Sequence, residues 1–337
     1  MDNKLIYEFS SQKTDGDASL SNILGGKGAN LAEMSKLGIQ VPPGFTITTE
    51  ACNYFSKNKK LPDGLKEEII NYVSNLESLS QKSFGNSESP LLLSVRSGGM
   101  ISMPGMMDSI LNIGLNDDNV QSLAKAFNDE RFALDSYRRL IQMYSNVVLG
   151  VEMDRFEAVI ANKKRMDNVT SDADFNVEQL EWIINAYKNT VERFTNSPFP
   201  QDPHEQLLGA IEAVFSSWQN KRAITYRKIN NIPDSLGTGA TIQTMVFGNL
   251  NDKSGTGVAF TRNPSNGSKE LYGEYLINAQ GEDVVAGIRT PHPIKNDDSV
   301  EQESLESKFP NAYKEIKEIA SKLEKHFKEV QDLEFTI

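Results

Sequence analysis

Apolar residues recur every three or four positions over most of the first two thirds of the chain. Leu31, Met34 and Leu37 follow this spacing, and Gly38 comes directly after them. Such spacing places side chains on one face of an α-helix, and a glycine often ends one. The pattern therefore predicts a helix over Gly28–Leu37. It predicts further helices over Glu50–Ser56, Leu65–Leu79, Arg131–Leu149, Val177–Phe194 and Pro203–Ile229.

A two-residue alternation of apolar and polar positions marks the segments that we expect to be strands. Phe45–Thr48 alternates after a proline and glycine break, and Leu91–Val95 is a compact apolar run. Short segments of this kind between turn residues are typical of β-strands. After Gly237 this period dominates, and further strands are predicted over Thr241–Phe247, Gly257–Thr261, Leu271–Asn278 and Asp332–Ile337.

The order of these patterns predicts an α+β protein. Every periodic segment from about Asp117 to Asn230 is helical, and sheet-forming segments lie on both sides of this block. Between Phe309 and Val330 the apolar spacing is again that of an amphipathic helix. It spans too few heptads for a coiled coil, so we expect this helix to pack on a sheet.

Composition places the chain among ordinary globular proteins and narrows its partners. It has 337 residues, of which 38% are hydrophobic and 24% charged, which suits one lobed domain or two domains. The net charge of −11 repels polyanions, and no basic run offsets it, so neither nucleic acid nor a membrane is an expected partner. No stretch approaches the ~18 apolar residues that cross a bilayer, and a cytoplasmic location is expected.

Metal-binding and disulfide chemistry have little support among the cysteine and histidines. Cys52 is the only cysteine, so no internal disulfide and no cysteine-rich zinc site can form. His204, His292 and His326 are far apart and lack metal-ligand spacing. We expect these histidines to be solvated surface residues.

Two glycine-containing segments carry the cationic candidates. Gly25-Gly26-Lys27-Gly28 stands before a predicted helix, where free backbone N–H groups and a lysine favour an anion such as phosphate. It does not match the Walker A spacing, and the alternative is a glycine turn with a surface lysine. In Ser94-Val95-Arg96-Ser97-Gly98-Gly99, an arginine leaves a strand just before glycines that allow close approach of a ligand. The alternative there is an arginine paired with a carboxylate.

The next segment, Met100–Asp108, has four methionines beside Pro104 and Gly105. Methionines re-pack easily, and glycine and proline supply hinges, so we interpret the segment as a mobile lid over phosphates. Methionine clusters also fill cores, but a packed core segment seldom has Pro-Gly in its middle.

The acidic candidates lie near the end of the chain. Asp332 and Glu334 are two residues apart, so on a strand both carboxylates project from one face and suit Mg²⁺. Solvent-facing strands carry such pairs as well. The segments Gly255–Val258 and Gln280–Asp283 are predicted to be turns, with Glu282 and Asp283 placed for a sugar hydroxyl or a metal. Cationic groups early and acidic groups late would suit a nucleotide clamped between two lobes.

Several of these motifs resemble a known family. Gly25–Met34 and Ser94–Ser97 resemble the amino-terminal ATP-grasp domain shared by pyruvate phosphate dikinase and phosphoenolpyruvate synthase. Ser102–Ser109 and Leu111–Leu115 resemble the dikinase branch in particular. The motifs Gly257–Pro264, Gln280–Val285 and Asp332–Thr336 also match, so the resemblance covers nearly the whole chain.

The resemblance implies an ATP-grasp fold, in which two sheet-containing lobes clasp a nucleotide. Residues 1–116 and 203–247 would form the first lobe, 117–202 a helical insertion, and 248–337 the second lobe, truncated at its end. The phosphohistidine and pyruvate domains would lie outside these residues, because the carrier segment and the barrel cysteine of the family are not found here.

The resemblance also assigns roles to individual residues. Lys27 and Arg96 would be catalytic and hold the phosphates. Asp332 and Glu334 would bind Mg²⁺. Further ATP contacts would come from Gly98, Gly99, Met103, Gly105, Gln243, Thr244, Met245, Glu282 and Asp283.

The implied activity is that of a phosphotransferase enzyme that converts ATP, phosphate and pyruvate to AMP, diphosphate and phosphoenolpyruvate through a phosphohistidine. The chain alone would be monomeric and would not complete the reaction, whereas the full-length enzyme would be a homodimer. Its partners would be ATP, inorganic phosphate and the phosphohistidine carrier domain. The alternatives are the ATP-binding domain of phosphoenolpyruvate synthase and a non-catalytic nucleotide-binding module.

Overall fold

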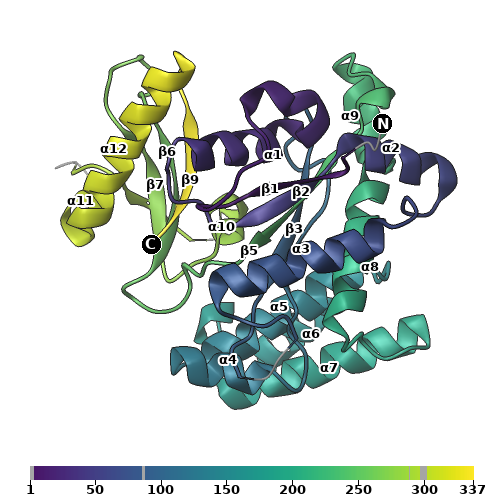
Figure 1. The fold of residues 1–337 in the computed structure, drawn as a ribbon. Helices are drawn as coiled ribbons and strands as arrows, with labels where there is room; N and C mark the ends of the chain where they lie inside the picture. Colours follow the sequence, from purple (N-terminus) through teal and green to yellow (C-terminus); the bar gives the residue numbers. More distant parts are fainter. Residues whose placement is uncertain (1–3, 86–87, 288, 297–301) are drawn as a thin grey trace. The chain divides into compact units, whose positions relative to one another are not determined.

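The computed structural model describes the whole chain except residues 1–3, 86–87, 288 and 297–301 (Figure 1). Its contacts divide the chain into two compact units, Met1–Met245 and Val246–Ile337. Each unit contains one antiparallel sheet and several helices. The α+β class predicted from the sequence is therefore confirmed.

A five-stranded sheet forms the centre of the first unit, in the order β1-β2-β5-β3-β4. The strand β5, which comes last in the sequence, is inserted between β2 and β3. Arg96 lies on β3 opposite Thr241 of β5 and Ser109 of β4, so it occupies the interior of the sheet. The bounds are β1 (Ile6–Phe9), β2 (Gly44–Ile47), β3 (Leu93–Gly98), β4 (Ser109–Ile113) and β5 (Gly239–Thr244).

The two faces of this sheet differ in polarity because side chains alternate along each strand. One face is apolar, and Phe45 packs there against Tyr72 of α3 with ring centroids 5.4 Å apart. On the other face, Thr46 and Thr241 share a buried hydroxyl contact of 3.2 Å. A Cβ atom on Gly28 of α1 would lie 2.7 Å from the Thr46 hydroxyl oxygen, so α1 covers this polar face closely. Figure 1 shows α1 on one side of the sheet and α3 and α8 on the other.

The helices of the first unit follow the predicted periodicity, with two differences. The segment predicted as one helix over Pro203–Ile229 is broken at Trp218–Asn220 into α8 and α9. The helix predicted to start at Gly28 starts at Ser21 and is kinked at Gly25. The bounds are α1 (Ser21–Lys36), α2 (Thr49–Asn58), α3 (Leu65–Ser80), α4 (Val120–Phe127), α5 (Glu130–Val147), α6 (Met153–Asp167), α7 (Val177–Thr195), α8 (Pro203–Ser217) and α9 (Lys221–Ile229), with 3-10 turns at Ala18–Leu20, Asp172–Asp174 and Asp234–Leu236.

The second unit is a four-stranded sheet, ordered β8-β7-β6-β9, with a helix packed on it. Tyr275 of β7 and Ile316 and Ala320 of α12 share its core, as predicted for an amphipathic helix on a sheet. The predicted turn at Gly255–Val258 is wrong, since these residues belong to β6. The bounds are β6 (Gly255–Phe260), β7 (Tyr272–Ile277), β8 (His292–Pro293), β9 (Asp332–Thr336), α10 (Gly281–Ala286), α11 (Leu305–Lys308) and α12 (Pro310–Phe327).

Two further observations concern the whole of the described chain. None of its helices in the described ranges combines the length and apolar character that a membrane span needs. Cys52 is a free, buried thiol on α2, and burial raises its pKa to about 11.

Candidate functional site

The kink in α1 brings the two glycine-containing segments together. Gly25 has φ 70° and ψ 165°, which lies outside the helical region. A positive φ of this size is readily adopted only by glycine. A Cβ atom there would lie 1.7 Å from the carbonyl oxygen of Gly98, and the Gly26 N–H donates to the carbonyl of Gly99 at 2.9 Å. The backbone of α1 therefore rests directly on the end of β3, which a larger residue than glycine would prevent.

Lys27 stands in the turn of α1 that follows this kink. It is half-buried, and a Cβ atom added to Gly98 would lie 3.2 Å from the Lys27 Cβ. Arg96 is also half-buried and points to the same face of β3 as Gly98, because the two are separated by one residue. Arg96 was predicted at the exit of a strand, but β3 continues through it to Gly98. Lys27 of α1 thus lies over the polar face of the sheet to which Arg96 points.

The segment after β3 is an exposed loop with an anchored end. Met100 and Ile101 are 46% and 44% exposed, and Gly105 has φ 69°. Met103, by contrast, is buried, and its carbonyl accepts a hydrogen bond from the Met106 N–H at 3.1 Å. Exposed apolar residues beside a glycine turn agree with the lid interpretation of the sequence, whereas Met103 acts as a core residue.

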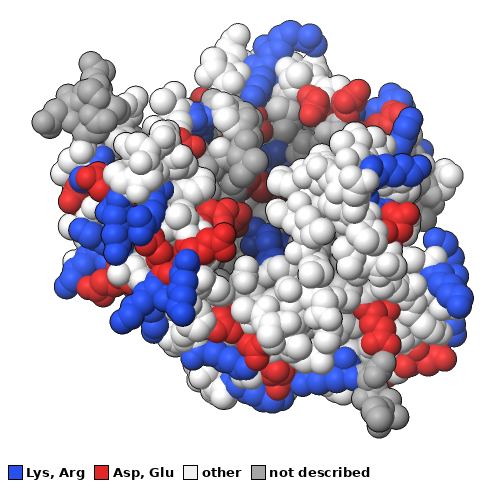
Figure 2. Space-filling model, turned by 90° about the horizontal axis from the view of Figure 1, so that it is seen from above, with Lys and Arg blue, Asp and Glu red and all other residues white. Residues whose placement is uncertain are grey.

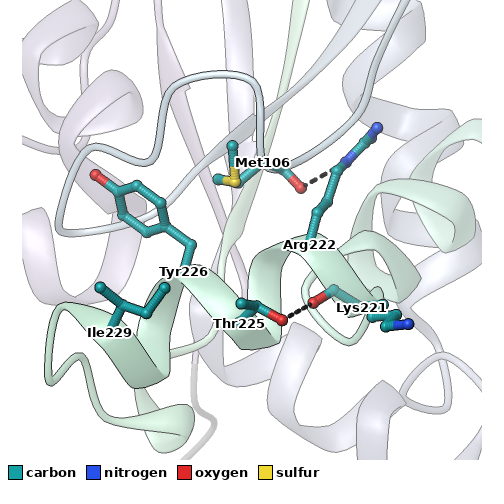
Figure 3. A pocket seen from close by; sticks show the side chains of 6 residues that line it. All are labelled: Met106, Lys221, Arg222, Thr225, Tyr226 and Ile229. Carbon is teal, nitrogen blue, oxygen red and sulfur yellow. Dashed lines mark hydrogen bonds between the residues drawn. The ribbon is translucent and has the colours of Figure 1, made fainter.

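A pocket of about 540 Å³ lies between this loop and α9 (Figure 3). The side chains that line it are those of Met106, Lys221, Arg222, Thr225, Tyr226 and Ile229. In Figure 3 the Arg222 side chain extends toward the carbonyl of Met106. Of these residues, only Met106 belongs to a segment that was singled out from the sequence. The five on α9 were missed, because the apolar spacing of Pro203–Ile229 predicts one continuous amphipathic helix.

Gln243, Thr244 and Met245 end the first unit. Gln243 is buried on the same face as Thr241, and its side-chain Nε2 donates to the carbonyl of Pro42 at 2.9 Å. Thr244 points to the opposite face, and its N–H donates to the Pro43 carbonyl at 3.0 Å. Of these residues, only Gln243 shares the polar face with Arg96 on the strand itself.

Asp332 and Glu334 show the alternation predicted for β9. Both carboxylates are exposed, while Leu333 and Phe335 pack against the core of the second unit. The strand pairs with β6 along its whole length, and Asp332 lies opposite Phe260. Within the described residues β9 is an edge strand, and no group of three or more acidic, histidine or cysteine side chains there could hold a metal ion.

Glu282 and Asp283 begin α10, although Gln280–Asp283 was predicted to be a turn. Glu282 is exposed. The Asp283 carboxylate accepts a hydrogen bond from the Gln280 N–H at 2.8 Å, which satisfies one of the free donors at the start of the helix. The three-residue spacing of Gln280 and Asp283 is that of a capping box, a signal that the sequence interpretation missed.

On the face drawn in Figure 2, charged side chains of the two signs lie near one another. Figure 2 shows lysine and arginine side chains lying among aspartate and glutamate side chains on the face drawn. Anion binding on that face must therefore come from a local arrangement of groups. The buried charges are paired: Asp135 contacts Arg138 at 2.7 Å and Arg139 at 3.0 Å. Burial raises the pKa of Asp135, but the two arginines outweigh it and hold that pKa well below its usual range.

Comparison with known proteins gives a family for the chain. Residues 21–313 match the family model described as the AMP/ATP-binding domain of pyruvate phosphate dikinase. The chain is 52% identical to the pyruvate, phosphate dikinase of Clostridium symbiosum over 336 residues, which cover 99% of this chain and 37% of that protein.

Similar relatives come from other bacteria and from plants. The dikinase of Rhizobium meliloti is 51% identical over 339 residues, with 99% of this chain and 38% of that protein covered. The chloroplastic dikinase of Mesembryanthemum crystallinum is 49% identical, with 99% and 34% covered. The chain therefore spans little more than a third of the length of these relatives. By the family model and by these identities, the chain belongs to the pyruvate phosphate dikinase family.

Proposed function

We propose that this chain is the ATP-binding and phosphotransfer domain of a pyruvate phosphate dikinase. The full enzyme would convert ATP, phosphate and pyruvate to AMP, diphosphate and phosphoenolpyruvate through a phosphohistidine that lies outside these residues. The observation that carries the proposal is the contact of the Gly25–Lys27 segment with Gly98 and Gly99. It joins the start of a helical turn, a lysine and a glycine-rich strand end on the polar face that also bears Arg96.

This arrangement supports phosphate binding by several groups at once. Backbone N–H groups at the start of a helix attract anions, and a lysine adds a point charge. Arg96 can fork onto two phosphate oxygens, which a lysine cannot do. The glycines at positions 98 and 99 let the Gly25–Lys27 segment, and with it the Lys27 side chain, approach the end of β3. We therefore assign Lys27 and Arg96 to the phosphates, and the backbone from Gly98 to Gly105 to the γ-phosphate or free phosphate.

The remaining contacts are assigned from the resemblance and from their positions. Gln243, Thr244 and Met245 would line the adenine. Glu282 and Asp283 would face the ribose or the metal. Asp332 and Glu334 would hold Mg²⁺, because exposed carboxylates on one strand face are the hard oxygen ligands that this ion takes. When bound, Mg²⁺ neutralises phosphate charge and orients the phosphates for transfer.

The proposed fold is ATP-grasp. Residues 1–116 with 203–247 would form one lobe, 117–202 a helical insertion, and 248–337 the other lobe. Positioning and charge neutralisation account for most of the catalysis in phosphoryl transfer, so a site rich in cations and glycines fits the task. The proposed partners are ATP, phosphate and the phosphohistidine domain. We expect the chain by itself to be monomeric and the full enzyme to be a homodimer that works in the cytoplasm.

Titration calorimetry with Mg·ATP tests the assignment of the phosphate ligands. Lys27→Ala and Arg96→Ala should each weaken binding at least tenfold, since a charge-assisted hydrogen bond is worth about 1.5–3 kcal/mol. Lys228→Ala is the matched control, because Lys228 is an exposed lysine on α9. Asp332→Asn should weaken ATP binding when Mg²⁺ is present and leave it unchanged when the metal is chelated.

Three outcomes would contradict the proposal. Binding by the Lys27 and Arg96 variants as tight as that of the unaltered chain would remove both residues from the phosphate site. In the full-length enzyme, a phosphohistidine-forming reaction that proceeds equally without inorganic phosphate would favour a phosphoenolpyruvate synthase. If the full-length enzyme binds ATP and forms no phosphohistidine, the domain would be a non-catalytic nucleotide-binding module.

A further inference from the structure

The turn between α8 and α9 contacts both ends of the Gly99–Asp108 loop. At the start of the loop, a Cβ atom on Gly99 would lie 3.6 Å from the Trp218 ring. At its end, the carbonyl of Met106 accepts two hydrogen bonds, from Asn220 Nδ2 at 3.2 Å and from Arg222 Nε at 3.1 Å, of which Figure 3 shows the second. A single carbonyl held by two side-chain donors has its direction fixed, because both donors must stay in line with its lone pairs.

Arg222 holds the loop at a second point. Its Nη2 forms an ion pair with the Asp108 carboxylate, and the Asp108 N–H in turn donates to Ser217 Oγ at 3.3 Å. One guanidinium thus spans a carbonyl and a carboxylate two residues apart. The planar fork of arginine can do this, whereas the ammonium group of lysine presents a single point of contact. Since the Arg222 side chain is 53% exposed, the ion pair adds little stability and mainly sets geometry.

Asn220 connects the Met106–Asp108 end of the loop to the start of α9. Its Oδ1 accepts from the Ala223 N–H at 2.8 Å and so caps the helix, while its Nδ2 donates to Met106. The side-chain amide of Asn220 therefore binds both the start of α9 and the end of the loop. Movement of this end of the loop away from α9 would break the hydrogen bond between Asn220 and Met106. By contrast Met100, Ile101, Pro104 and Gly105 on the first half of the loop are exposed.

We propose that Arg222 is a positioning residue for ATP, which fixes the Met106–Asp108 end of the loop so that its exposed first half closes on the γ-phosphate. The inference rests on the proposed function, because the loop backbone is the part assigned to that phosphate. A loop fixed at one end has fewer conformations to lose when it closes, and this lowers the cost of binding. Arg222 acts through the loop and does not itself touch the nucleotide.

The test compares ATP with AMP as ligands of the same variants by titration calorimetry. AMP has no γ-phosphate, so a loop that binds this group affects ATP alone. Arg222→Ala should lower the affinity for Mg·ATP roughly fivefold to tenfold and the affinity for AMP less than about twofold. Arg222→Lys should fall in between, since lysine keeps the pair with Asp108 and loses the bond to Met106. Lys228→Ala on the same helix should change neither affinity.

A double-mutant cycle keeps the test decisive if one variant folds poorly. Asp108→Ala should repeat the selective loss for ATP, and the double variant should lose less than the two single losses combined, because both act through one contact. Equal losses for ATP and AMP, or full ATP affinity in Arg222→Ala, would overturn the positioning role. Failure of the unaltered chain to bind ATP at all would instead refute the proposed function, and the two results are therefore distinguishable.

Discussion

The first unit holds its candidate phosphate ligands against packed backbone, whereas the second displays its candidate metal ligands on an exposed strand. Lys27 lies beside Gly98 in a close contact that only glycines permit. Asp332 and Glu334 project outward, and only their neighbours Leu333 and Phe335 contribute to the core. In the first unit, a substitution at the candidate site should also destabilise the fold. In the second unit, a substitution of the candidate metal ligands should leave the fold intact.

The two units also differ in how far their charged side chains are buried. The first unit buries Asp135, Arg138 and Arg227, each with partners. In the second, the pair of Arg262 with Glu324 is partly buried, and the pair of Lys295 with Glu270 is exposed, at 49% and 59% of the two side chains. A buried charge that loses its partner is costly, and an exposed one is not. Substitutions of similar chemistry should therefore have very different effects in the two units.

The largest expected effect is at Asp135. Asp135→Asn should lower the free energy of unfolding by about 3–5 kcal/mol, because the buried Arg138 would keep only its longer ion pair, 3.7 Å, with Asp172. Asp332→Asn should change it by less than about 0.5 kcal/mol. Urea denaturation of each variant measures both values. Similar losses for the two variants would remove the contrast between the units.

The contacts of Asp135 with Arg138 and Arg139 also predict that the free energy of unfolding depends on pH. The two arginines hold the pKa of Asp135 below its unfolded value of about 3.9, so the folded state binds fewer protons there. The stability that this carboxylate contributes is present above the unfolded pKa and is lost as the pH falls below it. Asp135→Asn should therefore flatten the fall in stability between roughly pH 4 and 2.

The second effect concerns the close contact at Gly25. Gly25→Ala should cost roughly 3 kcal/mol or more, since its Cβ would overlap the Gly98 carbonyl in addition to the strain of a positive φ. Gly38→Ala is the matched control: Gly38 has φ 71°, and nothing lies within 4 Å of an added Cβ. It should cost only about 1–2 kcal/mol. Equal losses in urea denaturation would mean that the contact of α1 with β3 yields easily.

The smallest effect separates the two faces of β9. Leu333→Ala should cost about 1–2 kcal/mol, because Leu333 is only partly buried on the core of the second unit. Asp332→Ala on the opposite face should cost less than about 0.5 kcal/mol. Thermal unfolding followed by circular dichroism compares them. A larger loss for Asp332→Ala would show that this carboxylate supports the fold.

Periodicity predicted most of the helices and the alternation of β9, because both depend on which side of one element is buried. It missed β1, β4 and β8, and it took Gly255–Val258 for a turn, although these residues belong to β6. Strand pairing depends on partners far away in the sequence, and no local pattern records them. The contact of Gly25 with Gly98 was unpredictable for the same reason, although each motif was recognised separately.

The contacts of Arg222 and Asn220 with the loop could not be predicted from the sequence, for a different reason. Arg222 looks like one of many exposed charges on an amphipathic helix, and only the break after Ser217 aims it at Met106. The break has a local signal in Asn220, a favoured capping residue, but apolar spacing that continues through Trp218 conceals it. Capping residues inside a long periodic segment therefore deserve as much weight as the period itself.

The two hydrogen bonds of the Asn220 side-chain amide respond differently to deamidation of this residue. Hydrolysis of an asparagine side chain yields aspartate, which still caps a helix through its carboxylate oxygen. The cap on Ala223 would survive, but the donor to the Met106 carbonyl would be replaced by a negative oxygen that repels it. Arg222 would still bind Met106 and Asp108, so a molecule changed in this way should keep its helices and hold the loop less tightly. Hydrolysis of one side-chain amide would thus weaken the loop contact without removing the helix cap.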